Sequence, residues 1–150
     1  MSKISFYQVM NGEIVKYACK LLEKCYASKM NTFVQIGDEE TLETLNKTLW
    51  TFAQKSFIPH GSMNDPIPEK QPIYLSVNDE CPIEAEILML LYKEKLDIKN
   101  FKRVLNIIDG LDREKVNEAK KFALKLLGLG HEVDYYIQNN KGLWEKTDIN

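Results

Sequence analysis

The sequence predicts an α/β fold: a three-layer, Rossmann-like arrangement in which a mostly parallel central sheet is flanked by helices on both faces. Segments rich in β-branched and aromatic residues alternate with amphipathic helical segments, and the links between them are short. A continuous apolar run at residues 86–92 is typical of a strand buried inside a parallel sheet. Because 150 residues suit one domain, we expect residues 1–150 to form a single unit.

The first predicted elements alternate between strand and helix. Residues 4–10 are rich in β-branched and aromatic side chains, which predicts a strand. Residues 14–28 place apolar side chains at three- and four-residue steps, which predicts a helix. Residues 32–36 form a second strand, and a helix capped by Asp38 follows to residue 49. Strands linked through helices in this way are expected to pair in parallel.

A proline-rich segment interrupts this alternation. Residues 59–72 contain four prolines and are predicted to be a loop. Strands are predicted at residues 73–77 and at the apolar run 86–92. Residues 101–108 alternate only weakly, which is compatible with a strand or a helix, and we favour a strand.

The C-terminal part is predicted to contain one long helix and one more strand. The helix covers residues 112–127 and begins with Asp112 as a capping side chain. A strand follows at residues 132–138. A turn at Asn139-Asn140 then leads into residues 142–145.

Composition and charge exclude several classes of function. The net charge of −2 provides no general attraction for nucleic acid, so direct DNA binding is not expected. The three cysteines Cys19, Cys25 and Cys81 are an odd number without C-x-x-C spacing, which argues against a disulfide or a metal site. We find no signal peptide and no apolar run of membrane-spanning length. A reduced, cytoplasmic protein without membrane contact is the expectation.

No motif of this chain predicts catalysis. Gly128-Leu129-Gly130 follows a helix and precedes a strand, which is the reverse of a dinucleotide-binding loop and is typical of a helix end. His60 and His131 lack metal-ligand spacing, and Ser62 is not in a nucleophile elbow. We therefore expect no catalytic residue, no metal and no cofactor.

The helix at residues 112–127 carries a distinctive mixture of leucine and lysine. Val116, Ala119, Ala123, Leu126 and Leu127 are predicted to form its core-facing stripe. Lys120 borders that stripe, Leu124 lies beyond it, and Lys121 and Lys125 come next around the helix. An exposed leucine among lysines suits a partner with carboxylates and an apolar anchor. The alternative is a solvated basic face with one stray leucine.

Aromatic and apolar residues also gather around residues 49–61. Leu49-Trp50-Thr51-Phe52 ends a charged helix, and Ser56-Phe57-Ile58-Pro59-His60-Gly61 follows. These residue types do not make a nucleophile–base pair by themselves. An apolar patch at the end of a helix and beside a loop is more typical of a partner surface.

The chain resembles the chi subunit of bacterial DNA polymerase III over nearly its whole length. The resemblance begins with Phe6-Tyr7, Leu49-Trp50 and the segment from Ser56 to Gly61. The further matching segments are Gln71-Pro72-Ile73, Phe101 to Gly110, Ala119 to Lys125, Gly130-His131, Tyr135-Tyr136 and Trp144. The combination of Trp with Ser-Phe-x-Pro-His-Gly is the most specific of these features.

This resemblance implies a non-catalytic accessory subunit of the DNA polymerase III holoenzyme, associated with the clamp loader. Such a subunit links the polymerase to single-stranded DNA-binding protein by holding its acidic, Phe-ended C-terminal tail, and it contacts DNA only indirectly. A second partner, the psi subunit or another protein, is implied near Trp50 and Phe57. The residues implied for the tail are Lys120, Lys121, Phe122, Leu124 and Lys125.

Two other functions remain as alternatives. The first is a Rossmann-like nucleotide-binding enzyme, which would require a glycine-rich loop after the first strand. The loop at residues 10–13 has one glycine and an acid instead. The second is direct binding of single-stranded DNA with Trp50, Phe52 and Tyr74 as stacking platforms. The adjoining residues 38–47 hold four acids against one lysine, which opposes that second alternative.

Overall fold

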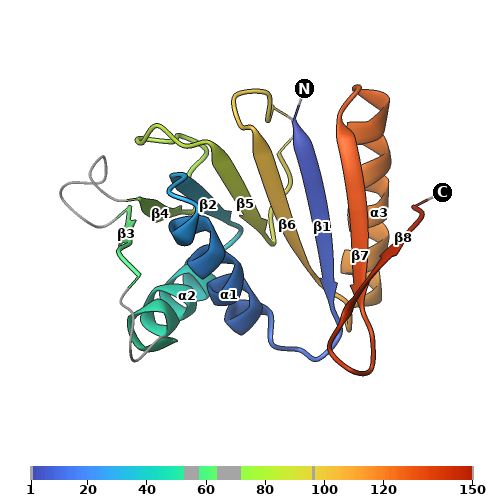
Figure 1. Ribbon diagram of the computed structural model, residues 1–150, viewed down its shortest axis with the longest axis horizontal. Helices are drawn as coiled ribbons and strands as arrows, with labels where there is room; N and C mark the ends of the chain where they lie inside the picture. The colour runs from blue at the N-terminus through green and yellow to red at the C-terminus, as the bar shows by residue number, and fades with distance from the viewer. Residues whose placement is uncertain (1, 53–57, 64–71, 96, 150) are drawn as a thin grey trace.

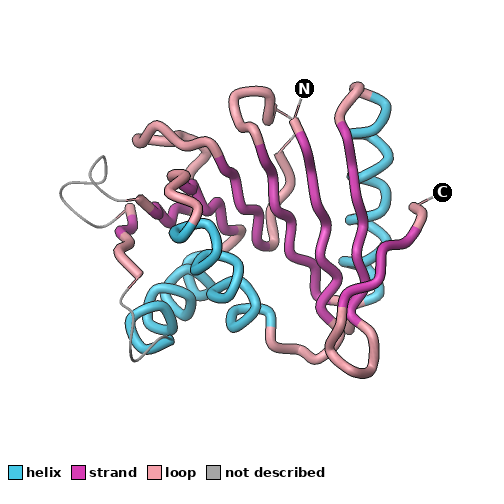
Figure 2. The backbone as a smooth tube through the Cα atoms, in the orientation of Figure 1, coloured by secondary structure: helices cyan, strands magenta, loops and turns pink. Residues whose placement is uncertain are grey.

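An eight-stranded sheet with three helices forms the computed structural model of the protein (Figures 1 and 2), which describes residues 2–52, 58–63, 72–95 and 97–149. The elements are β1 (Lys3–Val9), α1 (Ile14–Ala27), β2 (Thr32–Ile36), α2 (Glu39–Phe52), β3 (Gly61–Ser62), β4 (Ile73–Ser76), β5 (Ile87–Leu91), β6 (Arg103–Asp109), α3 (Arg113–Gly128), β7 (Glu132–Gln138) and β8 (Trp144–Thr147). The predicted α/β class and the predicted mostly parallel sheet are confirmed.

The strand order is β3-β4-β2-β5-β6-β1-β7-β8. All neighbouring pairs are parallel except β7 and β8, which form an antiparallel hairpin. Doubly wound nucleotide-binding folds place the first two strands side by side. Here β5 and β6 lie between β1 and β2, so the order differs from the one that the term Rossmann-like implies.

The two faces of the sheet carry separate apolar cores. The core on one face combines α1 and α2 side chains, such as Leu22 and Leu45, with Val34 and Met89 of the sheet. The core on the other face combines Phe122 and other α3 side chains with alternate residues of the same strands. Figure 1 places α1 and α2 on the near side of the sheet and α3 behind β7.

Capping side chains begin α2 and α3 as the sequence predicted. The Asp38 carboxylate accepts a hydrogen bond from the backbone N–H of Thr41 at 2.7 Å. The Asp112 carboxylate accepts one from the N–H of Lys115 at 3.2 Å. Each of these bonds satisfies an N–H that has no partner within the first turn of its helix. At the other end of α3, Gly130 has a φ of +91°, a conformation that glycine adopts without strain.

Two short strands were not predicted. β3 lies inside the segment expected to be a loop and pairs with β4 over only two residues, Gly61 and Ser62. β8 follows the predicted turn, whose Asn139 side chain accepts hydrogen bonds from the N–H groups of Lys141 and Leu143. Both strands lie at edges of the sheet. Whether an edge segment forms a strand depends on pairing with its neighbour more than on its own apolar pattern, so the sequence does not reveal it.

The predicted core stripe of α3 is wrong at two positions. Phe122 is buried with 1% of its surface exposed, and its ring meets that of Phe6 edge to face at 5.9 Å. Leu127, which was predicted to be in the core, is 39% exposed. The ring of Phe122 packs over β1. Leu127 follows it by five residues, about 140° around the helix axis, and therefore points away from the sheet.

Candidate partner-binding surfaces

α3 presents leucines and lysines on its exposed side. Leu124 is 44% exposed, Lys121 and Lys125 are exposed, and Lys120 is half-buried. Residues four apart share a side of a helix, so Lys120 lies beside Leu124, and Lys121 lies beside Lys125. We call Lys120, Lys121, Leu124, Lys125 and Leu127 the leucine–lysine surface.

The lysines of the leucine–lysine surface are available for an acidic partner. Within α3, Lys115 and Glu118 form an ion pair at 4.0 Å. No ion pair among the described residues involves Lys120, Lys121 or Lys125. Exposed leucines beside unpaired ammonium groups provide apolar contact area together with hydrogen-bond donors for carboxylates.

Phe122 does not belong to this exposed surface. Its side chain lies on the opposite side of α3, within the core that also contains Phe6 and Tyr135. We therefore correct its predicted role from partner contact to core residue that supports the helix. Phe122 also borders a crevice of about 290 Å³ between α3 and the ends of β5 and β6, where the buried Asn106 lies.

Trp50 forms a second exposed apolar feature, at the end of α2. It is 59% exposed, in agreement with the prediction of an exposed or half-exposed side chain. Phe57, the other residue predicted for this patch, lies outside the described residues. Trp50 therefore marks a candidate surface whose extent toward Phe57 stays a prediction.

His60 fixes the segment next to Trp50. Its Nδ1 lies 2.8 Å from the Ile58 carbonyl oxygen, and its Nε2 lies 2.9 Å from Oδ1 of Asn46 on α2. The His60 ring is buried, and both of its nitrogens have polar partners. This arrangement is structural, since it ties the chain after α2 back onto that helix.

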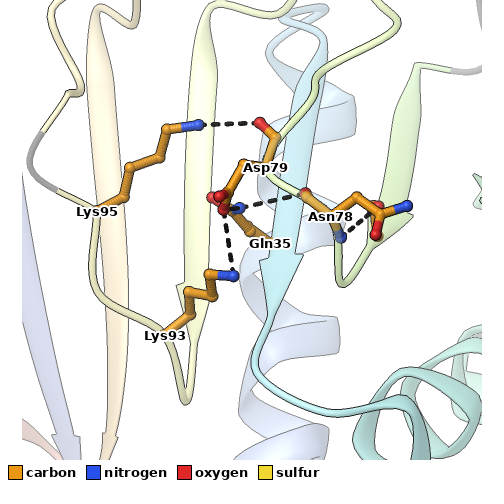
Figure 3. A network of polar contacts seen from close by, with 6 residues as sticks. Gln35, Asn78, Asp79, Lys93 and Lys95 are labelled. Atoms are coloured by element: carbon orange, nitrogen blue, oxygen red, sulfur yellow. Dashed lines mark hydrogen bonds and ion pairs between the residues drawn. The ribbon is translucent and has the colours of Figure 1, made fainter.

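A polar network closes the carboxyl ends of β2, β4 and β5 (Figure 3). The Gln35 amide donates to the Asn78 carbonyl at 3.2 Å and also to the Asp79 carboxylate. Lys93 pairs with Asp79 at 3.2 Å, and Lys95 donates to the Asp79 carbonyl. The hydrogen bond and the charge of Lys93 hold the pKa of the Asp79 carboxyl below its ordinary value. This network ties two loops together at the edge where nucleotide-binding folds place their ligands.

The residues that the sequence-based alternatives named do not form the sites that those alternatives require. The loop between β1 and α1 is closed by the Asn11 side chain, which accepts a hydrogen bond from the N–H of Glu13 at 3.0 Å. Tyr74 is buried against Phe33, so it is not available as a stacking platform in the alternative of direct DNA binding.

The described residues contain neither a metal-binding cluster nor a membrane-spanning helix. In the described parts of the chain, no three His, Cys, Asp or Glu side chains come together in a group able to hold a metal ion. No helix in those parts has the length and apolar character needed to cross a membrane.

Burial raises the pKa of the Cys19 thiol to about 12, which keeps it protonated and unreactive.

Comparison with known proteins places the chain in a family. A family model described as "DNA polymerase III chi subunit, HolC" matches residues 1–133. The chain belongs to the DNA polymerase III chi subunit family. The match includes α3 and Trp50 and ends at the start of β7, so most of β7 and all of β8 lie outside the matched residues.

Two relatives agree with this assignment to the chi family. The "Probable DNA polymerase III subunit chi" of Rickettsia prowazekii (strain Madrid E) is 36% identical over 156 aligned positions, which cover 97% of this chain and 92% of that protein. The "DNA polymerase III subunit chi" of Pseudomonas aeruginosa (strain PAO1) is 25% identical over 112 positions, which cover 72% of this chain and 78% of that protein.

Some features of this chi family member could not be found from the sequence alone. The exposed position of Leu127 depends on how Phe122 packs, and the periodicity of α3 does not specify it. The crevice at Asn106 depends on the strand order, because β5 and β6 are adjacent only through tertiary pairing. Tyr7 of β1 and Tyr136 of β7 stack for the same reason, because these two strands pair although they lie far apart in the sequence.

Proposed function

We propose that this protein is the chi subunit of a bacterial DNA polymerase III holoenzyme, a non-catalytic accessory protein of a DNA-directed DNA polymerase. In this proposal it works in the cytoplasm, associates with the clamp loader, and links the replicase to the C-terminal tail of single-stranded DNA-binding protein during replication. Family membership supports the assignment to the replicase. The observation that carries the tail-binding role is the leucine–lysine surface of α3.

The chemistry of that surface matches the chemistry of the tail. An acidic tail that ends in Phe offers side-chain carboxylates, a terminal carboxylate and one apolar ring. Lys120, Lys121 and Lys125 are placed to donate charge-assisted hydrogen bonds to the carboxylates. Leu124 and Leu127 provide the apolar contact for the ring. No cofactor is needed for this role.

Trp50 is proposed as the contact for a second protein, either the psi subunit or another replisome component. An exposed tryptophan is among the side chains that contribute most to protein interfaces. Phe57 is included in this proposal on the basis of the sequence resemblance. The leucine–lysine surface and Trp50 lie on different helices, α3 and α2, so the two partners would occupy separate places.

The alternative, a Rossmann-like nucleotide-binding enzyme, has less support. Its ligand would lie at the carboxyl ends of the strands, and the tie between Gln35, Asp79 and Lys93 occupies part of that edge. The strand order also differs from that of the dinucleotide-binding folds.

The test of the proposed function is a binding measurement with two forms of single-stranded DNA-binding protein. Calorimetry is performed with the intact protein and with a form that lacks its last few residues. We expect binding of the intact form and no binding of the shortened form. Equal binding of both forms would show that the protein does not bind the C-terminal tail.

A further inference from the structure

Four aromatic rings gather on the sheet face that carries α1. Tyr7 of β1 lies at the centre and stacks on Tyr136 of β7 at 5.5 Å between ring centroids. Trp144 of β8 meets Tyr7 edge to face at 5.5 Å and contacts Tyr17 of α1 at 4.8 Å. In Figures 1 and 2, no described helix lies in front of β1 and β7. The four aromatic side chains are half-buried.

A cavity of about 350 Å³ lies between this ring cluster and α1. Its floor contains the buried Leu105 of β6, and Tyr17 and Trp144 form part of its walls. Arg103, the first residue of β6, and Lys24, in the last turn of α1, also line it. We call this space the tyrosine–tryptophan cavity.

The strand register separates the aromatic and cationic ends of the cavity. Tyr7 pairs with Ile107 on β6, whereas Arg103 pairs with Lys3, four residues earlier on β1. Four residues of a strand span roughly 13 Å, which the long arginine side chain partly bridges. Burial raises the pKa of the Tyr7 phenol, and a hydrogen bond with Ser5 and the charge of Arg103 partly offset that rise.

The cationic end has an excess of positive charge. No carboxylate is among the described side chains that line the cavity. Arg103 and Lys24 form no ion pair within 4.0 Å with any described residue. Asp134 lies on the same sheet face, but its carboxylate is bound to Lys146 at 3.0 Å. A protein with a net charge of −2 thus has an uncompensated positive end beside an aromatic cluster.

We propose that the tyrosine–tryptophan cavity binds a nucleotide, with its base against Tyr17 and Trp144 and its phosphate on Arg103 and Lys24. Base faces stack on aromatic side chains regardless of sequence. An arginine guanidinium matches a phosphate by two parallel hydrogen bonds, and a lysine adds a point charge. The nucleotide is either free or a unit of single-stranded DNA, since both present the same base and phosphate. This site goes beyond the proposed function, because the leucine–lysine surface belongs to α3 on the other face of the sheet.

The test uses Trp144 as its reporter. The chain has two tryptophans, so the Trp50→Phe variant leaves Trp144 as the only one. Its fluorescence is followed while deoxyadenosine monophosphate, a short oligothymidylate or inorganic phosphate is added. We expect saturable quenching by at least one of the two nucleotide probes and much weaker binding of inorganic phosphate. Binding of the mononucleotide identifies a free nucleotide as the ligand, and binding of only the oligothymidylate identifies a DNA strand.

Variants at the cationic end test the assignment of the phosphate. Arg103→Gln in the same single-tryptophan protein is expected to lower the affinity about tenfold, as loss of a charge-assisted contact does. Lys102→Gln is the matched control, because Lys102 is exposed, pairs with Glu86 and does not line the cavity. Lys24→Gln repeats the test from α1, and thermal unfolding of each variant verifies its fold.

Three results would overturn the proposal. They are the absence of quenching by both nucleotide probes, equal affinities of the Arg103→Gln and Lys102→Gln proteins, and inorganic phosphate binding as tightly as the nucleotides. Binding of the tail of single-stranded DNA-binding protein is measured separately on the Arg103→Gln protein and should be unchanged. The two proposals therefore succeed or fail independently.

Discussion

The ring of Trp50 meets the ring of His60 at 5.1 Å between centroids, with the two planes inclined by 61°. His60 is buried and has polar partners at both ring nitrogens, whereas Trp50 is mostly exposed. The histidine thus supports the inner side of the indole, and the outer side faces solvent. This explains how Trp50 and the segment Pro59-His60-Gly61, separated in sequence, contribute to one feature at the end of α2.

Replacement of Trp50 should affect partner binding more than stability. We expect Trp50→Ala to lower the free energy of unfolding by about 1 kcal/mol, the size of one aromatic contact. Leu49→Ala, at the buried neighbouring position, is expected to cost about 2–5 kcal/mol. Urea denaturation measures both values. If Trp50→Ala costs as much as Leu49→Ala, Trp50 is a core residue and its role as a partner surface is wrong.

Phe122 and Leu124 should respond in opposite ways to substitution. Phe122→Ala removes a buried ring and is expected to lower the free energy of unfolding by about 3–5 kcal/mol. Leu124→Ala should change it by less than about 0.5 kcal/mol, because its side chain is exposed. Binding of the tail peptide should weaken in the Leu124→Ala protein. A strongly destabilised Leu124→Ala protein would contradict the placement of Leu124 on the exposed surface.

The phenol of Tyr135 should make the protein sensitive to alkali. Its hydroxyl donates to the Gln8 amide oxygen at 2.7 Å, and burial raises its pKa to about 12. In the unfolded chain the same phenol ionises near pH 10. The unfolded state therefore loses its proton first, and the free energy of unfolding should fall as pH rises from about 10 to about 12.

The Tyr135→Phe protein isolates this contribution. It cannot ionise at this position, so its free energy of unfolding should fall less between about pH 9 and pH 12 than that of the unmodified protein. Urea denaturation across this range provides the comparison. Burial also raises the pKa values of Tyr7 and Tyr17, so part of the alkaline destabilisation should remain in the variant. The same pH dependence in both proteins would show that Tyr135 does not contribute.

The purified protein should have no polymerase, nuclease or nucleotide-hydrolysing activity. The sequence has no phosphate-binding loop and no nucleophile–base pair that spacing would bring together. Activity assays on the isolated chain measure this directly. A reproducible turnover that a point substitution in this chain abolishes would refute the assignment as an accessory subunit.

The sequence predicted most of the fold because its elements carry strong local signals. Residues 32–36 and 132–138 match β2 and β7 at both ends, and the caps Asp38 and Asp112 act where they were placed. The strand order was not predictable, because which strands become neighbours depends on long-range packing. β8 was missed because Trp144–Thr147 is short, half charged and paired only at one edge.

The candidate site was predicted in part for a related reason. The lysines and Leu124 of α3 were placed on an exposed side from helical periodicity alone. The same periodicity placed Leu127 in the core, and the family resemblance implied Phe122 as a partner contact. Neither specifies which large side chain of α3 packs against the sheet. The tyrosine–tryptophan cavity had no sequence signal, because Tyr7, Tyr17 and Trp144 meet only through the pairing of β1, β7 and β8.

The affinity of the tail peptide for variants of the leucine–lysine surface tests the central claim most directly. The double variant Lys121→Ala, Lys125→Ala is compared with Lys20→Ala, which removes an exposed lysine from α1 on the other face of the sheet. We predict an affinity loss of about tenfold or more for the double variant and none for the control. The binding that remains should weaken as salt rises, because exposed charges are screened within about 10 Å at 0.1 M salt. Equal affinities of the double variant and the Lys20→Ala control would contradict the account.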